Sequence, residues 1–243
     1  MSASPERLNR YLARRGVASR RGADGLIGAG RVTVNGAVAV LGTTVDPGSR
    51  VAVDGRAVTG GRRLETLMLN KPRGVVTTVR DPHRRPTVMS LVREPVPGLV
   101  PVGRLDADSR GLILLSTDGE LAHHLTHPRF GVTKCYRAVL DREVSDSDLS
   151  RLLAGVELED GPARALSAQR VSEARASTIE VTMGEGRKRE LRRLCAALGA
   201  TVLDLVRVGF GPLRLGRLTE GATRPLTPRE IEALYAAVGM TAP

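Results

Sequence analysis

The hydrophobic pattern of the first 55 residues predicts two short helices followed by short strands. Apolar residues recur at helical spacing in 6–15 and again in 19–29, where Ser19 is a natural N-cap. Alternating residues at 31–34 and 50–53, each closed by an Asn-Gly or Asp-Gly turn, predict strands. These elements form one small, helix-rich module that also holds a small sheet.

Beyond residue 60 the predicted strands and helices do not alternate regularly. Strands are predicted at 66–70, 75–79, 112–115, 134–140 and 178–183, and helices at 120–126 and 187–198. The Gly-rich, polar residues 56–63 are typical of a linker. We therefore predict an α+β fold, with a small helix-rich domain at 1–60 and a larger domain at 61–243. The larger domain holds a mixed, mostly antiparallel sheet flanked by helices.

The composition narrows the class of partner. The 37 Lys and Arg exceed the 26 Asp and Glu, and a net charge of +11 favours a polyanion. Aromatic residues make up only 2%, so stacking on many bases is not available. Two cysteines without a CxxC pair argue against a disulfide framework or a structural zinc site. Since no apolar stretch reaches membrane length, we expect a soluble, cytoplasmic protein that binds no membrane.

Basic residues gather on the two N-terminal helices. Arg7, Arg10 and Arg14 share one face of the first helix, and Arg20 and Arg21 lie in the first turn of the second. Cations are unfavourable at a helix N-terminus, and an anionic ligand would relieve that cost. A solvated charged face and an RNA-binding surface both explain this pattern.

Two carboxylates, Asp106 and Asp108, precede the apolar run 112–115. A calcium loop would need an acidic residue and a glutamate where Arg110 and Thr117 stand. An aspartyl-phosphate phosphotransferase also uses such a pair, but no further acidic cluster is available to hold its magnesium.

Three histidines, His123, His124 and His127, suggest zinc. They lack the glutamate of a zinc-protease motif, and consecutive helical residues point about 100° apart. We therefore interpret them as helix-surface residues, and we predict that the protein uses no metal.

The helix at 187–198 offers a partner for a carboxylate. Arg192 falls at the edge of its apolar stripe, whereas Arg189 and Arg193 fall on the far face. A buried aspartate needs a countercharge to stay ionised. Arg192 is the predicted countercharge.

Several motifs resemble known families. RLNRYLARRGVASRRGADGLIGAGRVTVNG resembles the S4-like RNA-binding domain. The segments LMLNKPRGVVTT, VGRLDADSRGLILLSTDGELAHHLTHP, KCYRA, EGRKRELRRLCAALG and LVRVGFGPLRLG resemble, in order, the ribosomal RNA pseudouridine synthases of the RsuA/RluB branch. The likeness spans essentially the whole chain and is closer to the RluB type. One departure is Arg189-Glu190, where the family often has Gln before the hydrophobic-Arg pair.

The resemblance implies that Asp106 is the nucleophile that isomerises a uridine to pseudouridine, with no cofactor. It implies that Tyr136 stacks on the uracil and assists proton removal, and that Arg192 pairs with Asp106. Leu191 would pack on the other side of the base, and Lys134 would also contact the substrate. Arg104 would fill the stack that the flipped base leaves, unless it forms a structural salt bridge with Asp106 or Asp108.

The expected partner is ribosomal RNA, free or in a pre-ribosomal particle, and the protein is expected to be a monomer. The favoured substrate is 23S rRNA of the large subunit. The alternatives are 16S rRNA and, in another class, a non-enzymatic RNA-binding translation factor. The cations expected to bind RNA are Arg7, Arg10, Arg14, Arg20, Arg21, Lys71, Arg73, Lys188, Arg189 and Arg193.

Overall fold

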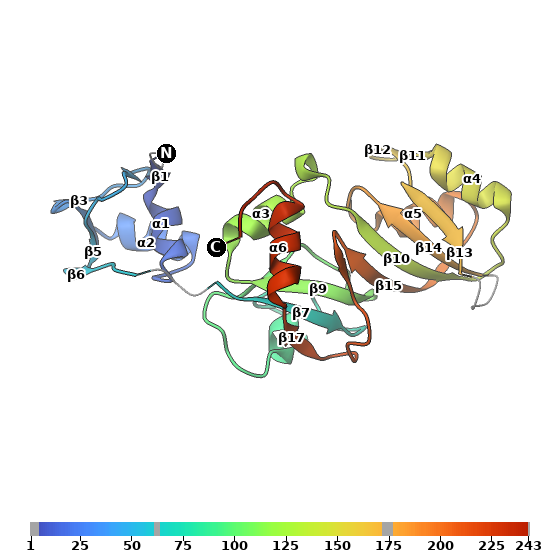
Figure 1. The fold of residues 1–243 in the computed structure, drawn as a ribbon, viewed down its shortest axis with the longest axis horizontal. Helices are drawn as coiled ribbons and strands as arrows, with labels where there is room; N and C mark the ends of the chain where they lie inside the picture. Colours follow the sequence, from blue (N-terminus) through green and yellow to red (C-terminus); the bar gives the residue numbers. More distant parts are fainter. Residues whose placement is uncertain (1–4, 61–63, 172–176, 243) are drawn as a thin grey trace. The chain divides into compact units, whose positions relative to one another are not determined.

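The chain folds into two compact units, drawn in Figure 1. The computed structural model describes residues 5–60, 64–171 and 177–242. Unit 1 comprises residues 1–65 together with 96–99 and 117–119, and unit 2 comprises the remainder. The predicted boundary at residue 60 adjoins residues 61–63, which lie outside the described residues.

Unit 1 has the two predicted helices and short strands. The elements are α1 (Leu8–Arg14), α2 (Arg20–Gly28), β1 (Glu6–Arg7), β2 (Val32–Val34), β3 (Ala37–Val38), β4 (Thr44–Val45), β5 (Val51–Val53) and β6 (Arg56–Ala57). Ser19 caps α2 by accepting a hydrogen bond from the backbone N of Gly22, as predicted. The predicted linker starts too early, because Arg56 and Ala57 pair with β5.

Unit 2 is built on one large mixed sheet and a separate two-stranded sheet. Its helices are α3 (Gly119–Thr126), α4 (Asp146–Ala154), α5 (Glu190–Ala197) and α6 (Pro228–Ala236). Its strands are β7 (Thr66–Lys71), β8 (Val100–Val102), β9 (Arg110–Ser116), β10 (Lys134–Leu140), β11 (Val156–Leu158), β12 (Gly161–Ala163), β13 (Ser167–Arg170), β14 (Thr178–Met183), β15 (Val202–Phe210), β16 (Leu213–Arg214) and β17 (Thr223–Pro225). The main order is β13-β14-β10-β15-β9-β7-β17, and β9 and β15 run parallel while the other neighbours in this order are antiparallel. The predicted α+β class is confirmed.

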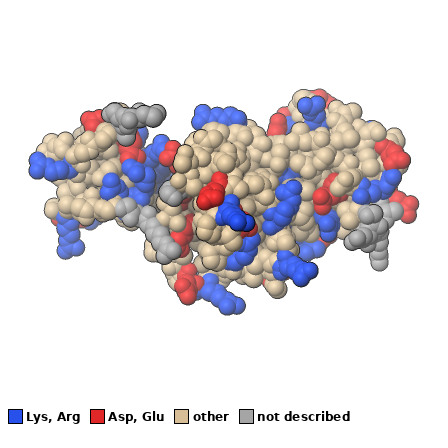
Figure 2. All heavy atoms as spheres, in the orientation of Figure 1, with Lys and Arg blue, Asp and Glu red and all other residues tan. Residues whose placement is uncertain are grey.

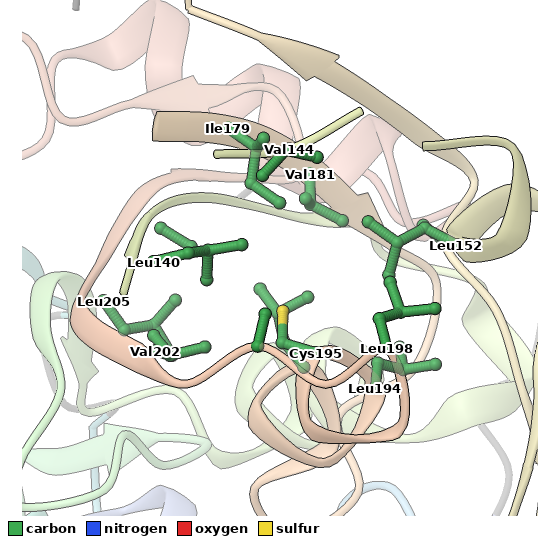
Figure 3. Close-up of a cluster of buried hydrophobic side chains, with 14 of the residues drawn as sticks. Leu140, Val144, Leu152, Ile179, Val181, Leu194, Cys195, Leu198, Val202 and Leu205 are labelled. Atoms are coloured by element: carbon green, nitrogen blue, oxygen red, sulfur yellow. The ribbon is translucent and has the colours of Figure 1, made fainter. Parts of the chain in front are cut away.

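Two apolar cores cover the sheet. Helices α3 and α6 pack against β7 and β9, and α5 packs with α4 against β10, β14 and β15. Figure 3 shows Leu194, Cys195 and Leu198 facing the second core, so Cys195 is the core residue that its position on the helix predicts. The apolar run in β9 is buried on both faces, because Leu112 and Leu114 join the first core and Ile113 and Leu115 are also fully buried.

Two predicted elements differ in the structure. The helix expected from residue 187 begins at Glu190, because Arg189 has a φ of 52°, in the left-handed region. The strand expected at 75–79 is absent from the described residues there, and Val76 forms only an isolated bridge with Thr87. The backbone of Val76 bonds to Pro86 and Val88, and the side chain of Thr77 bonds to the turn that carries Asp106.

Candidate active site

A pocket of about 550 Å³ opens in unit 2 at the centre of the sheet. Its walls come from the turn before β9, the starts of β10 and α5, the end of β14 and the middle of β15. The residues predicted for catalysis or substrate contact all line it: Arg104, Asp106, Lys134, Tyr136, Leu191 and Arg192. The fold therefore brings together side chains that are far apart in the sequence.

The turn that carries Asp106 is fixed by the segment after β7. Thr77 Oγ1 donates to the carbonyl oxygen of Leu105 at 2.7 Å, and it accepts from the backbone N of Leu105 at 3.3 Å. The backbone N of Gly74 donates to the carbonyl oxygen of Ala107 at 2.7 Å. The backbone on both sides of Asp106 is therefore held.

The Asp106 side chain is half-buried rather than buried as predicted. Within the described residues it has no ion-pair partner at 4.0 Å or less, and neither does the exposed side chain of Arg104. Arg110 pairs instead with Asp204 at 2.5 Å and Glu220 at 3.3 Å. The alternative salt bridge of Arg104 is therefore not formed, and the Asp106 carboxylate stays open to the pocket.

Lys71 lies beneath the same turn, buried rather than exposed as its predicted role in RNA binding requires. Its side chain is fully buried, because the end of β7 turns it inward. Its Nζ donates to the carbonyl oxygens of Ser109 at 2.6 Å and Pro72 at 2.9 Å. Burial lowers the pKa of Lys71 to about 8, against the opposing charges of Asp108 and Asp106.

Replacing Lys71 by methionine should leave RNA affinity within about twofold of wild type, because the amine cannot reach a phosphate. It should also change how stability depends on pH. Between about pH 8 and 10.5 the unfolded chain keeps the Lys71 proton while the folded chain releases it, so this residue makes the wild type more stable as pH rises. The change is at most about 3 kcal/mol, since tenfold in proton affinity corresponds to about 1.4 kcal/mol.

Urea unfolding of both proteins across that pH range measures the difference. The folded-state pKa assigned to Lys71 is wrong if the two free energies of unfolding change in parallel. A large loss of RNA affinity in the variant would return Lys71 to the RNA-binding surface.

Arg192 contacts Asp108 rather than its predicted partner Asp106. Its Nη2 lies 3.4 Å from Asp108 Oδ2 and donates to the carbonyl oxygen of Asp108 at 3.2 Å, while Nη1 donates to the carbonyl oxygen of Val202 at 2.8 Å. Arg189 adds hydrogen bonds of 2.9 and 3.1 Å to the same carboxylate. Partial burial would raise the pKa of Asp108, but the hydrogen bond from Arg189 and the charges of Arg192 and Arg189 keep it below its ordinary value. Arg192 therefore ties α5 to the turn of Asp106.

Tyr136 lies beside a buried arginine that the sequence analysis missed. In the register of β10 and β15, Tyr136 is directly opposite Arg207. Arg207 is in turn opposite Gly111 of β9, where an added Cβ would lie 2.4 Å from the Arg207 carbonyl oxygen. With φ of 104° as well, position 111 requires glycine. Arg207 also lines the pocket, where it is buried. A basic residue within an otherwise apolar, strand-like run is the sequence signal that could have identified it.

The pocket lip, residues 184–189, is held by Arg187. Its guanidinium donates to Pro162 O at 2.6 Å, Gly161 O at 3.2 Å and the Asp160 carboxylate at 3.1 Å. Glu190, which is buried, accepts from the backbone N of Arg187 at 3.1 Å and from its Nε at 3.2 Å. These contacts give Glu190 a structural role where the family often has glutamine.

The other cations predicted to bind RNA differ in whether a carboxylate already pairs with them. Arg193 pairs with Asp160 through bonds of 2.7 and 2.9 Å, and Arg73 pairs with Asp204 at 3.0 Å. Lys188 and Arg189 are exposed at the lip, and Arg189 is already paired with Asp108. Figure 2 shows Lys and Arg interspersed with Asp and Glu on one face of the molecule.

Burial lowers the pKa of Lys134, and the charge of Arg207 lowers it further.

His123 and His124 lie in α3, and His127 follows its last residue. His124 is half-buried, with its ring 4.2 Å from that of Phe130, and His123 and His127 are exposed. Among the residues that the structure describes, no group of three or more His, Cys, Asp or Glu side chains is placed to hold a metal ion. In the same residues no helix is both long and apolar enough to cross a membrane.

Comparison with known proteins gives consistent matches. Residues 65–197 match the family model of RNA pseudouridylate synthases, and residues 6–51 match that of the S4 domain. An uncharacterized RNA pseudouridine synthase of Aquifex aeolicus is 40% identical over 238 residues, covering 96% of this chain and 95% of the relative. The ribosomal large subunit pseudouridine synthase B of Bacillus subtilis is 38% identical over 246 residues, covering 95% and 96%. A crystal structure of a pseudouridylate synthase aligns with a TM-score of 0.68 at 30% identity, covering 94% of this chain and 99% of that one.

Together these matches cover nearly all of both units. The synthase model covers the pocket residues from Arg104 to Arg192, and the S4 model covers α1, α2 and the first strands. The chain therefore belongs to the RNA pseudouridine synthase family, in the RsuA/RluB branch that carries an S4 domain, and its activity is the isomerisation of uridine in RNA.

Proposed function

We propose that this enzyme converts a specific uridine of 23S rRNA to pseudouridine, with Asp106 as its nucleophile. The observation that carries the proposal is the pocket in which Asp106, Tyr136, Leu191 and Arg192 meet. The name of the Bacillus subtilis relative supports the large subunit as the source of the substrate. We propose in addition that the enzyme acts as a monomer in the cytoplasm, on free rRNA or on a pre-ribosomal particle.

The chemistry requires one bond to break and another to form. The N1–C1′ bond of the uridine breaks, the uracil turns, and a C5–C1′ bond forms while the C5 proton is released and N1 gains one. A carboxylate serves as nucleophile and then as leaving group, either at the sugar, where it attacks or promotes elimination, or by adding to the base. Because the product is an isomer of the substrate, no cofactor is consumed.

The surrounding residues take the remaining roles. Tyr136 stacks on the uracil and assists proton removal, and Leu191 packs against the opposite side. Lys134 contacts the substrate at the pocket wall. A uridine in folded RNA must first be flipped out, at a cost of a few kcal/mol. The exposed Arg104 at the pocket edge, which forms no ion pair with either aspartate within the described residues, fills the stack that the base leaves.

Unit 1 supplies affinity through its exposed arginines. Arg7, Arg10, Arg14, Arg20 and Arg21 are all exposed. Arg14 contacts Glu6, and Arg7 Nη1 donates to the carbonyl oxygen of Gly42 at 2.6 Å. Arg20 and Arg21 have no hydrogen bond or ion pair from their side chains in the described part of the chain, and they lie in the first turn of α2. They are therefore the best placed to bind phosphate.

Replacing both Arg20 and Arg21 by alanine should weaken binding to a 23S rRNA transcript and lower the slope of affinity against salt by about 2, because two phosphate contacts are lost. The turnover number at saturating RNA should not change. Binding measured at several salt concentrations gives the slope. The matched control is Arg31→Ala, since Arg31 is already paired with Asp54. Equal slopes for the double variant and the wild type would remove unit 1 from phosphate binding.

Mapping pseudouridines in rRNA from cells with and without this protein tests the proposed substrate. One pseudouridine should be lost from 23S rRNA and restored by the wild-type gene. Loss from 16S rRNA would favour the alternative substrate. Loss from neither, with rRNA binding intact, would favour the non-enzymatic RNA-binding factor.

A further inference from the structure

The guanidinium of Arg207 is a buried cation at the floor of the pocket. Its residue is 3% exposed, and its Nε donates to the carbonyl oxygen of Leu112 at 2.6 Å. Its guanidinium carbon lies 5.1 Å from the centre of the Phe210 ring. These contacts fix the plane of the guanidinium while using only part of its donors.

One terminal nitrogen of the Arg207 side chain lacks a partner. Its Nη2 is buried without an acceptor among the described residues, and no carboxylate there lies within 4.0 Å of the guanidinium. A buried donor left without an acceptor costs free energy, and a buried charge without a countercharge costs more. An acceptor supplied by a bound ligand would remove that cost.

The position of Arg207 restricts the ligand to the base of the flipped nucleotide. A nucleotide turns about its backbone, so its phosphates stay at the mouth while the base enters most deeply. Arg207 is opposite Tyr136 in the sheet, next to the ring expected to stack on that base. The acceptors that uracil offers at its edges are the oxygens O2 and O4.

The geometry of the reaction adds a second argument. Turning uracil about its N3–C6 axis exchanges N1 with C5, and it also exchanges O2 with O4. A donor fixed to the protein therefore meets a carbonyl oxygen in the same place before and after the turn. When the N1–C1′ bond breaks, its electron pair stays on the uracil, and that charge is shared with these oxygens. A cation there stabilises the detached base.

Resting on the proposed function, we propose that Nη2 of Arg207 donates a hydrogen bond to a carbonyl oxygen of the target uracil and holds the base through its turn. Arg207 is then a catalytic residue that contacts the substrate before and after the rearrangement.

The test replaces the donor and the acceptor in turn. The RNA is a fragment that carries the target uridine identified by the mapping experiment. It is prepared with uridine, 2-thiouridine or 4-thiouridine at that position. The two thio-uridines weaken the acceptor at O2 or O4, because sulfur accepts a hydrogen bond less well than oxygen. The enzymes are full-length wild type, Arg207→Met and Arg207→Lys. The control is Arg214→Met, which alters an exposed arginine on β16, the short strand paired with β15.

Arg207→Met should lower kcat on uridine RNA by about 10- to 150-fold, the usual effect of losing a hydrogen bond to a charged group. Wild type and Arg214→Met should slow further on at least one thio-substituted RNA. Arg207→Met should show no such additional loss, and Arg207→Lys should have an intermediate rate. Thermal unfolding checks that the variants fold, and Arg207→Lys carries the comparison if Arg207→Met does not.

Equal effects of sulfur in wild type and in the Arg207 variants would overturn the proposal and leave Arg207 a structural support for Tyr136. A wild type that converts no uridine to pseudouridine in unmodified RNA would instead show that the proposed function is wrong, and the role of Arg207 would fail with it.

Discussion

Replacing Asp106 by asparagine should abolish turnover while leaving RNA affinity within about twofold of wild type. Asparagine keeps the shape of the side chain but cannot act as the nucleophile, and loss of a nucleophile typically costs about 10⁴- to 10⁶-fold. The fold should not change, because the turn is held through its backbone by Thr77 and Gly74. Release of the C5 hydrogen from labelled RNA, with binding measured in parallel, separates the two effects.

The matched control for this variant is Asp108→Asn. Asp108 has the same residue type in the same turn, but it pairs with Arg189 and Arg192. We expect Asp108→Asn to lose less than about tenfold in turnover, since it loosens the turn without removing the nucleophile. Turnover by Asp106→Asn, in protein shown by mass to be free of deamidation to aspartate, would reject Asp106 as the nucleophile. Loss of all activity in Asp108→Asn alone would assign the reaction to Asp108.

The sequence predicts best those helices and strands that depend only on the local pattern of apolar and polar residues. The strand at 134–140 and the cap at Ser19 need only alternation and a short polar side chain, and both occur as expected. The predicted strand at 75–79 does not form, because the Val76 backbone bonds to Pro86 and Val88 and the Thr77 side chain bonds to Leu105. Pairing over such a distance along the chain leaves no signal in the local sequence.

The candidate site divides in the same way. Motif resemblance identifies the residues that line the pocket, but it does not fix which cation meets which carboxylate. The helical wheel places Arg192 at the edge of the apolar stripe, yet a shift of two residues in the turn gives it Asp108 instead of Asp106. Lys71 and Arg207 reverse the usual expectation that basic residues face solvent, because backbone carbonyl oxygens accept their hydrogen bonds inside the protein.

Replacing Arg192 by alanine should lower kcat by about 10²- to 10³-fold with little change in KM, because a small displacement of a reacting group is costly. Arg192 joins α5, the carbonyl oxygen of Val202 and the turn at Asp108, and only 11% of its side chain is exposed. Its loss also removes a charge that lowers the pKa of Asp108. That pKa should rise toward its ordinary value, so the stability that ionised Asp108 contributes at neutral pH should decline at a higher pH during acidification than in wild type.

The neighbouring Arg193 provides the comparison on the same helix. Its guanidinium pairs with Asp160 in the β11–β12 turn, and Arg187 pairs with the same carboxylate. Arg193→Ala should therefore weaken the contact between α5 and this turn, while the bond from Arg187 remains. We expect kcat within about threefold of wild type, and acid unfolding with the wild-type dependence on Asp108, since a paired surface arginine contributes little. Steady-state kinetics at saturating RNA and acid unfolding of both variants decide the matter. If Arg192→Ala and Arg193→Ala lose the same activity and unfold alike in acid, the contact between Arg192 and the turn of Asp106 has no special role in catalysis.

A further variant, Arg192→Lys, separates the effect of charge from that of geometry. It keeps the positive charge, but its single ammonium cannot span the carbonyl oxygens of Val202 and Asp108 as the fork of arginine does.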